Sequence, residues 1–245
     1  MKEFLFYKPE ASGVDWKRID SLRHVMEKRT ASICSQRALL YTESFQSSEH
    51  EPYIIRKAKA FAHTLAHMDI YIQKHSLIFG NQASANFAAP IFPEYSIRWV
   101  IDELDSFDQR SGDVFQISET VKQDLRSIAP YWLHHTHEDA VNARLSEEIR
   151  LAEKQGVLHR GGISMSGDGH IVPDHEMILK RGFRSLIEEA QKALQGSGLD
   201  ENQRNYYEAV IISLEGALTF FRRYAKLAEE LAEKEADEKR SHELR

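Results

Sequence analysis

A proline-interrupted stretch, residues 80–96, constrains the fold of this chain more than any other segment. Pro90 and Pro93 each lack a backbone N–H and favour extended geometry at the residue before them, so the stretch is unsuited to a core helix. It nevertheless carries four large apolar side chains: Phe87, Ile91, Phe92 and Tyr95. Polar side chains that could satisfy a buried backbone are also present: Asn81, Gln82, Ser84 and Asn86. We therefore expect a packed structural crossover between a strand and a helix.

Composition places the chain among ordinary globular proteins. Of its 245 residues, 42% are hydrophobic and 29% are charged, which is ample material for one large domain or two small ones. The net charge of −6 and the scattered Lys and Arg give no electrostatic reason to expect nucleic-acid binding. No run approaches the roughly 18 apolar residues of a membrane span, and the N-terminal apolar run is too short for a signal peptide. Cys34 is the single cysteine, so we expect no internal disulfide and a reducing, cytoplasmic setting.

Helical periodicity dominates the chain outside residues 80–96. The expected helices cover residues 16–29, 35–45, 52–65, 98–107, 118–129, 136–155, 177–194 and 201–238. Ser118 is expected to cap one of them, which should end before Pro130. Short apolar runs at 68–71 and 77–79 predict one strand, or a pair of short strands, leading into Gly80.

The helix over residues 201–238 has an apolar stripe wide enough to imply burial on more than one side. The composition after Ala228 becomes rich in Glu and Lys, and the sequence still has helical character where it stops. This pattern suggests a partner domain or a continuation of the chain.

Two groups of histidines could in principle bind a metal ion. His63 and His67 are four residues apart on an expected helix, a spacing compatible with metal binding, but no third ligand is evident. His134, His135, His137 and Glu138 form a denser group, whose spacing matches no metal motif. We favour surface or half-buried histidines for the first group and a solvated helix start for the second. Cys34 has no partner histidine pattern and is expected to be a buried, inert thiol.

A glycine-rich stretch, residues 156–173, is the strongest candidate for binding chemistry. Five of its residues between Gly156 and Gly169 are glycine, but it lacks the Gly-Lys-Ser/Thr of a P-loop. A tight turn at Gly167 could leave the side chains of Asp168 and His170 facing one cavity. His170 could then hydrogen-bond a hydroxyl or carboxylate ligand, or donate a proton near neutral pH. A purely structural loop is the alternative interpretation.

Matching segments in conserved order and spacing give the chain a family resemblance. They comprise residues 37–44, 51–59, 77–84, 88–95, 102–105, 112–113, 117–119, 130–132, 167–170, 206–215 and 223–228, together with Trp99. On these segments the chain resembles the N-terminal region of the glycyl radical enzymes, within the pyruvate formate-lyase-like branch that includes glycerol and propanediol dehydratases. The resemblance covers most of the chain, residues 37–228.

The resemblance implies a mainly α chain: the helical N-terminal portion of a ten-stranded β/α barrel, with at most a few short strands. Residues 1–245 would then be one incomplete domain without the barrel centre or the glycyl radical domain. In the complete enzyme, an organic glycine radical is installed by an activating enzyme that uses S-adenosylmethionine and an iron–sulfur cluster. The radical passes to a cysteine that abstracts hydrogen from a small-molecule substrate. The complete enzyme is expected to be a homodimer, with no cofactor bound in this part of it.

The family's catalytic segments have no match in this sequence. The central Gly-Cys-x-Glu segment and the radical-bearing glycine loop are absent, and Cys34 does not match the catalytic cysteine. We therefore expect no catalytic residue in this chain and no turnover by the chain alone. Two alternatives to a diol dehydratase remain: a pyruvate formate-lyase-type C–C lyase or acyltransferase, and a non-catalytic helical protein that binds a full-length relative.

One binding residue is implied by the resemblance. His170, followed by Asp174 four residues on, matches the histidine with which similar diol dehydratases bind substrate hydroxyls. Asp168 lies where related lyases place other polar substrate contacts, a less specific correspondence. Phe87 stands where relatives commonly carry an arginine, which calls into question any ion pair that would position the loop.

Overall fold

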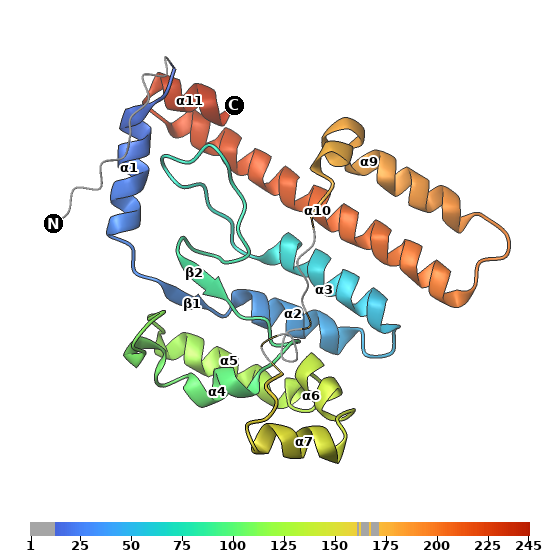
Figure 1. Ribbon diagram of the computed structural model, residues 1–245. Coiled ribbons are helices and arrows are strands. Elements are labelled where there is room, and N and C mark those ends of the chain that lie inside the picture. The colour runs from blue at the N-terminus through green and yellow to red at the C-terminus, as the bar shows by residue number, and fades with distance from the viewer. Residues whose placement is uncertain (1–12, 161, 163–166, 168–171) are drawn as a thin grey trace.

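The structure is a computed structural model that describes residues 13–160, 162, 167 and 172–245. Its described part is mainly helical and carries one small sheet (Figure 1). The helices are α1 (Trp16–Glu27), α2 (Gln36–Ser47), α3 (Tyr53–His67), α4 (Arg98–Glu103), α5 (Glu119–Trp132), α6 (His137–Asn142), α7 (Glu147–Lys154), α9 (His175–Leu194), α10 (Glu201–Lys234) and α11 (Glu238–Leu244), with a 3-10 turn at Phe107–Gln109. The strands are β1 (Ser32–Cys34) and β2 (Ala88–Pro90).

The two strands pair in parallel and tie the start of the chain to residues 80–96. Ser32 lies opposite Ala88, and Cys34 lies opposite Pro90. Parallel neighbours need a long crossover, and here α2 and α3 provide it. The strands expected at 68–71 and 77–79 were wrong, because these residues form irregular backbone. Phe79 of the second run packs against the end of α10, as does Ile72, which directly follows the first run.

The main hydrophobic core lies between α2 and the α4–α5 layer. Figure 1 shows α2 with α3 on one side and α5 on the other, and both contacts are extensive. The largest fully buried side chains of this core are Trp132, Phe107, Ile97, Leu104 and Leu125. The core therefore fixes the segment that follows β2, since Ile91 and Ile97 belong to it.

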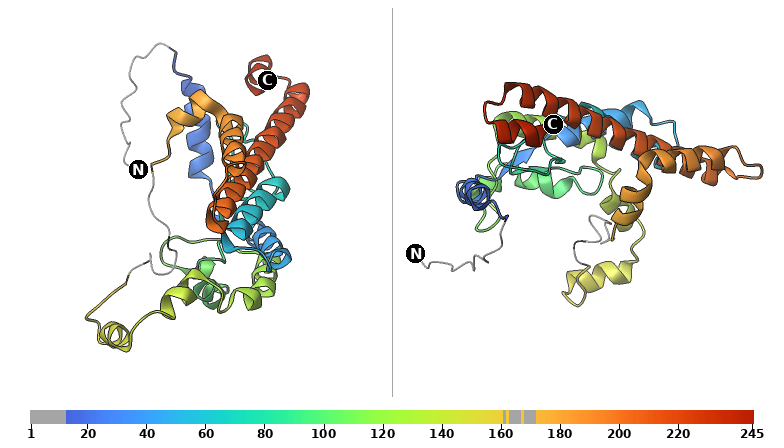
Figure 2. Two further views of the ribbon diagram at one scale, coloured as in Figure 1. Left: turned by 90° about the vertical axis from the view of Figure 1, so that its right-hand side faces the viewer. Right: turned by 90° about the horizontal axis from the view of Figure 1, so that it is seen from above.

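The long helix α10 packs on α3, α9 and α11, as its wide apolar stripe predicted. The contact with α3 depends on small residues, because a Cβ at Gly216 would lie 2.7 Å from both Cα and Cβ of Ala62. Farther along, the Arg223 guanidinium donates hydrogen bonds to the carbonyls of Leu65 and Met68, both at 2.6 Å. Figure 2 shows α9 alongside the first half of α10 as a helical hairpin.

The Gly216→Ala substitution should destabilise the chain despite the higher helix propensity of alanine. Propensity alone favours alanine by about 1 kcal/mol. The added methyl group, however, would meet backbone and side-chain atoms of Ala62, and overpacking of this kind costs about 1–3 kcal/mol. We expect a net loss of unfolding free energy, measured by urea denaturation. Glu215→Ala, at the exposed neighbouring position, is the control and should change stability little. Equal stabilities for the two variants would contradict the close helix contact.

Several helices differ from the sequence-based expectation, among them α4, which ends at Glu103 rather than near residue 107. Helix α5 begins at the expected Ser118 cap but continues past Pro130 to Trp132. A proline in the last turn removes a single backbone donor, and the burial of Trp132 outweighs that loss. The region expected to be one helix over 136–155 forms two helices, because the Ser146 side chain caps the start of α7 by accepting a hydrogen bond from the Ile149 N–H. Gly182 kinks α9, with φ 70° and ψ 162°. Helix α10 ends at Lys234, and α11 then folds back so that the Ser241 hydroxyl donates a hydrogen bond to the Ala232 carbonyl.

Candidate functional site

A buried ion pair anchors residues 93–96 (Pro93, Glu94, Tyr95 and Ser96), which we call the PEYS segment. Arg37 of α2 binds the Glu94 carboxylate with both terminal nitrogens, at 2.7 and 3.1 Å. The side chains are only 11% and 3% exposed, respectively. The guanidinium carbon also lies 3.8 Å from the ring centre of Phe92 and 4.5 Å from that of Tyr41. This planar, bidentate geometry is one that arginine can make and lysine cannot.

The phenol of Tyr41 lies beside the Arg37–Glu94 pair, and its pKa is shifted by burial and by these two charges. Burial raises the pKa of Tyr41 well above its usual range, and the nearby Glu94 carboxylate raises it further. The Arg37 guanidinium acts in the opposite direction but is the weaker influence. Tyr41 is therefore a neutral packing residue rather than an acid–base group.

The PEYS segment also caps helix α6. The first N–H groups of a helix have no partner within it, and here two of them bond to carbonyls of the segment. His137 donates to the Glu94 carbonyl and Glu138 to the Tyr95 carbonyl, both at 3.0 Å. Ser96 completes the contact by donating from Oγ to the Glu138 carboxylate at 2.6 Å. The PEYS segment thus connects Arg37 of α2 to the start of α6.

A capping box reinforces the start of α6. Thr136 and Asp139 bond to each other's backbone and side chain, and Arg98 adds an ion pair to Asp139 at 3.0 Å. Burial raises the pKa of Asp139, but the hydrogen bonds from Thr136 and Arg98 outweigh it and leave the pKa below its usual value. Asp139 is therefore ionised at neutral pH and holds the helix start.

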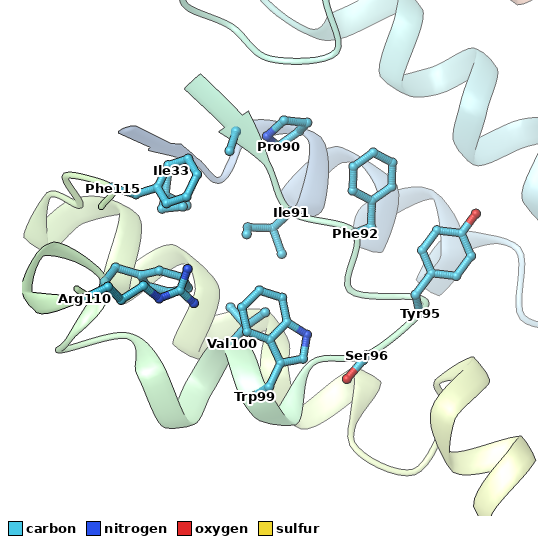
Figure 3. A pocket seen from close by; sticks show the side chains of 12 residues that line it. Ile33, Pro90, Ile91, Phe92, Tyr95, Ser96, Trp99, Val100, Arg110 and Phe115 are labelled. Atoms are coloured by element: carbon cyan, nitrogen blue, oxygen red, sulfur yellow. The ribbon is translucent and has the colours of Figure 1, made fainter. Parts of the chain in front are cut away.

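An apolar cavity of about 500 Å³ lies beside the PEYS segment, between β2, α4 and the 3-10 turn (Figure 3). Its walls include Ile33, Ile91, Phe92, Trp99, Phe107 and Phe115. Among the described wall residues Arg110 carries the charge, and its Nε donates a hydrogen bond to the Glu103 carboxylate at 2.8 Å. Ser96, the other polar side chain of note, is already committed to Glu138. The described walls thus offer mainly shape and apolar contact.

The residues predicted to bind substrate lie outside the described part of the chain. These are Asp168 and His170, so their role stays a prediction. Their neighbour Gly167 is described, with φ +61°, and lies against the ring of His137. Phe87 also has a left-handed backbone, with φ 56°, and its carbonyl accepts a hydrogen bond from Ser32 at 3.0 Å.

The histidine groups make local contacts. The His63 and His67 rings are 4.2 Å apart; His63 Nε2 lies 3.2 Å from a Glu43 oxygen, and His67 Nδ1 bonds to the His63 carbonyl. His135 bonds the Tyr131 carbonyl in the same way, at 2.9 Å. Within the described ranges, no group of three or more His, Cys, Asp and Glu side chains is arranged to hold a metal ion.

Cys34 is buried, as expected, with its Sγ 3.1 Å from Ser84 Oγ. That contact comes from residues 80–96, which are packed as predicted: Ala83, Ile91, Glu94 and Ser96 are all buried. The strand that enters the crossover is β2, however, and it lies inside the stretch rather than before it.

Sequence reasoning missed the pairing of Arg37 with Glu94. A signal was available, because Glu94 is the single charged residue in an otherwise apolar and aromatic run, residues 87–95. A carboxylate held in such a run needs a cationic partner. Arg37 lies 57 residues away, and spacing alone could not identify it.

The comparisons with known proteins agree with this architecture. A family model described as pyruvate formate lyase-like matches residues 15–245. The chain belongs to the pyruvate formate lyase-like family. No helix in the described part of this family member is long and apolar enough to cross a membrane.

Relatives of known sequence and structure include several dehydratases. The chain is 32% identical over 242 residues to (2S)-3-sulfopropanediol dehydratase of Klebsiella oxytoca, which covers 94% of this chain and 29% of the relative. The glycerol-bound B12-independent glycerol dehydratase of Clostridium butyricum is 34% identical, with a TM-score of 0.90, over 97% of this chain and 31% of that one. A glycyl radical enzyme of Archaeoglobus fulgidus is 34% identical, with a TM-score of 0.82, over 93% and 30%.

The expected family and fold class are confirmed by these matches. The chain is mainly helical and superposes on glycyl radical enzymes over about 30% of their length. It therefore spans less than a third of the relatives that it matches.

Proposed function

We propose that this chain forms part of a glycyl radical dehydratase that removes water from a small hydroxylated substrate. The observation that carries the proposal is the match to glycerol dehydratase at 34% identity and a TM-score of 0.90. The 32% identity to a sulfopropanediol dehydratase supports the same reaction class. A glycine radical, installed by an activating enzyme that uses S-adenosylmethionine and an iron–sulfur cluster, would supply the hydrogen-abstraction chemistry from outside this chain.

Within this proposal the chain contributes substrate binding rather than catalysis. His170 would hydrogen-bond a substrate hydroxyl, with Asp168 as a second polar contact. A histidine suits this role because one ring nitrogen can donate while the other accepts. The activating enzyme and a second copy of the complete enzyme are the proposed partners.

The proposal is tested on the complete enzyme that contains this chain, activated under anaerobic conditions. We expect consumption of glycerol or 1,2-propanediol with formation of the corresponding aldehyde. Consumption of pyruvate with coenzyme A, and of neither diol, would instead favour the C–C lyase. Turnover of a diol by the present chain as the sole lyase component would contradict its role as one part of the enzyme.

The His170→Ala substitution in the complete enzyme should raise the apparent KM for the diol. A buried hydroxyl left without its partner costs about 1–3 kcal/mol, which corresponds to a rise of about 5- to 150-fold. His159→Ala is the matched control, because His159 is exposed and close in sequence. An unchanged KM in the His170 variant would remove the residue from the binding site.

A further inference from the structure

The apolar cavity beside the PEYS segment is built from residues of the main hydrophobic core. Ile33 belongs to β1, and Ile91 directly follows β2. Val100 belongs to α4 and Phe107 to the 3-10 turn. All four are core residues, and Figure 3 shows three of them, Ile33, Ile91 and Val100, around one hollow. A volume of about 500 Å³ lies in the range of small-molecule sites, which are usually preformed and mostly apolar.

Aromatic rings form much of the cavity wall. Trp99 and Phe107 meet edge to face, with ring centres 6.1 Å apart and ring planes at 71°. Phe92 and Phe115 line the same cavity. Trp99 is 36% exposed, so part of its surface is still available for contact with a ligand. Because aromatic rings pack favourably in edge-to-face and offset arrangements, these walls favour a ligand that contains an aromatic ring.

Arg110 places a hydrogen-bond donor at this wall. Its guanidinium carbon lies 4.4 Å from the ring centre of Phe107 and 5.9 Å from that of Trp99. The Nε and Nη2 atoms donate hydrogen bonds to the Glu103 carboxylate. The remaining nitrogen, Nη1, has no hydrogen-bond partner among the residues that the structure describes. Nη1 therefore remains a donor for a ligand that occupies the cavity.

The Glu103 carboxylate favours a neutral ligand over an anionic one. Glu103 forms an ion pair with Arg110 and so balances the charge of the guanidinium. A carboxylate on the ligand would lie near a second carboxylate, and the two like charges would repel each other. A carbonyl or hydroxyl oxygen accepts the same hydrogen bond without this repulsion.

We propose that this cavity binds a small, neutral aromatic molecule. Its ring packs against Trp99 and Phe107, and its carbonyl or hydroxyl oxygen accepts a hydrogen bond from Arg110 Nη1. The proposal goes beyond the proposed function and does not depend on it, because neither His170 nor the dehydratase reaction enters the argument.

Benzamide is a suitable probe, because it joins one aromatic ring to a neutral carbonyl group. We expect it to bind the present chain with a dissociation constant of about 1 mM or lower, typical of a ligand of this size. Two-dimensional NMR should show a shift of the Trp99 indole N–H signal and none for Trp16 or Trp132, which do not line the cavity. A Trp99 signal that stays in place at about ten times that concentration would overturn the proposal.

Benzoate tests the preference for a neutral ligand. It has the same ring but carries a carboxylate, so we expect it to bind about fivefold more weakly than benzamide, or worse. Equal or tighter binding of benzoate would contradict the neutral acceptor.

The Arg110→Met substitution tests the donor, because methionine keeps a long apolar side chain but lacks Nη1. Benzamide should bind about fivefold more weakly or worse, whereas toluene, which has no acceptor, should change by less than about twofold. Arg126→Met is the matched control, because Arg126 is also paired with a carboxylate, that of Asp105, but does not line the cavity. It should alter the binding of neither molecule. Equal losses for benzamide and toluene in the Arg110 variant would reject the hydrogen bond.

A larger side chain at Ala89, which lines the cavity, tests the place of binding. Ala89→Leu should abolish the Trp99 shift while circular dichroism shows a retained fold, and an unchanged shift would overturn the proposal. If this variant does not fold, Arg110→Met and the benzoate comparison still decide it.

The last measurement uses the complete enzyme that contains this chain. Benzamide should bind it with an affinity similar to that for the chain. Binding to the chain alone would mean that another part of the enzyme fills the cavity, and the proposal would then be rejected.

Discussion

Replacing Glu94 by Gln should lower the unfolding free energy of this chain by about 3–5 kcal/mol, the usual cost of removing one partner of a buried ion pair. The Arg37 side chain is 11% exposed, so its charge would remain in the interior without a counter-charge. The rings of Phe92 and Tyr41 lie against the guanidinium, at 3.8 and 4.5 Å from its carbon to the ring centres. Urea denaturation followed by circular dichroism measures the change.

The pair matters most for the connection that it stabilises. Loss of the Glu94 charge should loosen the PEYS segment, and with it the two backbone hydrogen bonds that cap α6. The double variant Arg37→Met/Glu94→Leu removes both charges and should recover much of the stability, because apolar residues of similar volume often replace a buried pair without loss. A double variant less stable than either single one would contradict this explanation.

An exposed pair provides the control. Lys180 and Glu176 lie on α9, with side chains 72% and 74% exposed. Glu176→Gln should change stability by less than about 1 kcal/mol, since surface ion pairs contribute little. An effect of similar size at Glu94 would show that burial does not govern the Arg37–Glu94 interaction.

The helices could be predicted from sequence because their signals are local. Apolar periodicity located α1, α2, α3 and α9 to within a few residues, and Ser118 identified the start of α5. The errors occurred where tertiary contacts outweigh local preference. The burial of Trp132 carries α5 past Pro130, and the cap at Ser146 divides a region that has continuous helical periodicity.

The strands could not be predicted, because they have almost no local signal. Strands β1 and β2 are three residues each and pair across 56 residues of sequence, as the register of Ser32 with Ala88 shows. Whether so short a segment forms a strand depends on pairing with its neighbour more than on its own amino-acid composition. The runs at 68–71 and 77–79 have stronger strand character, yet both form irregular backbone, and Phe79 of the second run packs on the end of α10.

The candidate site also has residues that the sequence indicates and contacts that only the fold shows. Arg37 and Glu94 both lie in segments that carry the family resemblance, but their contact follows only from the fold. The start of α6 agrees with the helix start expected at residue 136, but the close approach of Gly167 to His137 follows only from the fold. The assignment of His170 rests on resemblance, since a histidine in a glycine-rich loop has no structural signature of its own.

Replacing Trp132 by Ala should also cost about 3–5 kcal/mol, the range found for large aromatic residues in cores. Trp132 is 1% exposed and contacts Phe45, with ring centres 5.2 Å apart. Its Nε1 donates a 2.7 Å hydrogen bond to Thr42 Oγ1, so the side chain joins α5 to α2 through apolar packing and through this hydrogen bond. Thermal and urea unfolding should both report the loss.

Two further variants test this account of Trp132. Thr42→Val keeps the volume near the indole but leaves its N–H without a partner, which should cost about 1–3 kcal/mol. Trp99→Ala is the matched control, because Trp99 is 36% exposed and should lose less on truncation. The helix end after Pro130 depends on Trp132, so its loss should also unwind the last turn of α5, detected as faster amide exchange over residues 129–133. If Trp132→Ala costs no more than Trp99→Ala, burial of Trp132 is not what carries α5 past the proline.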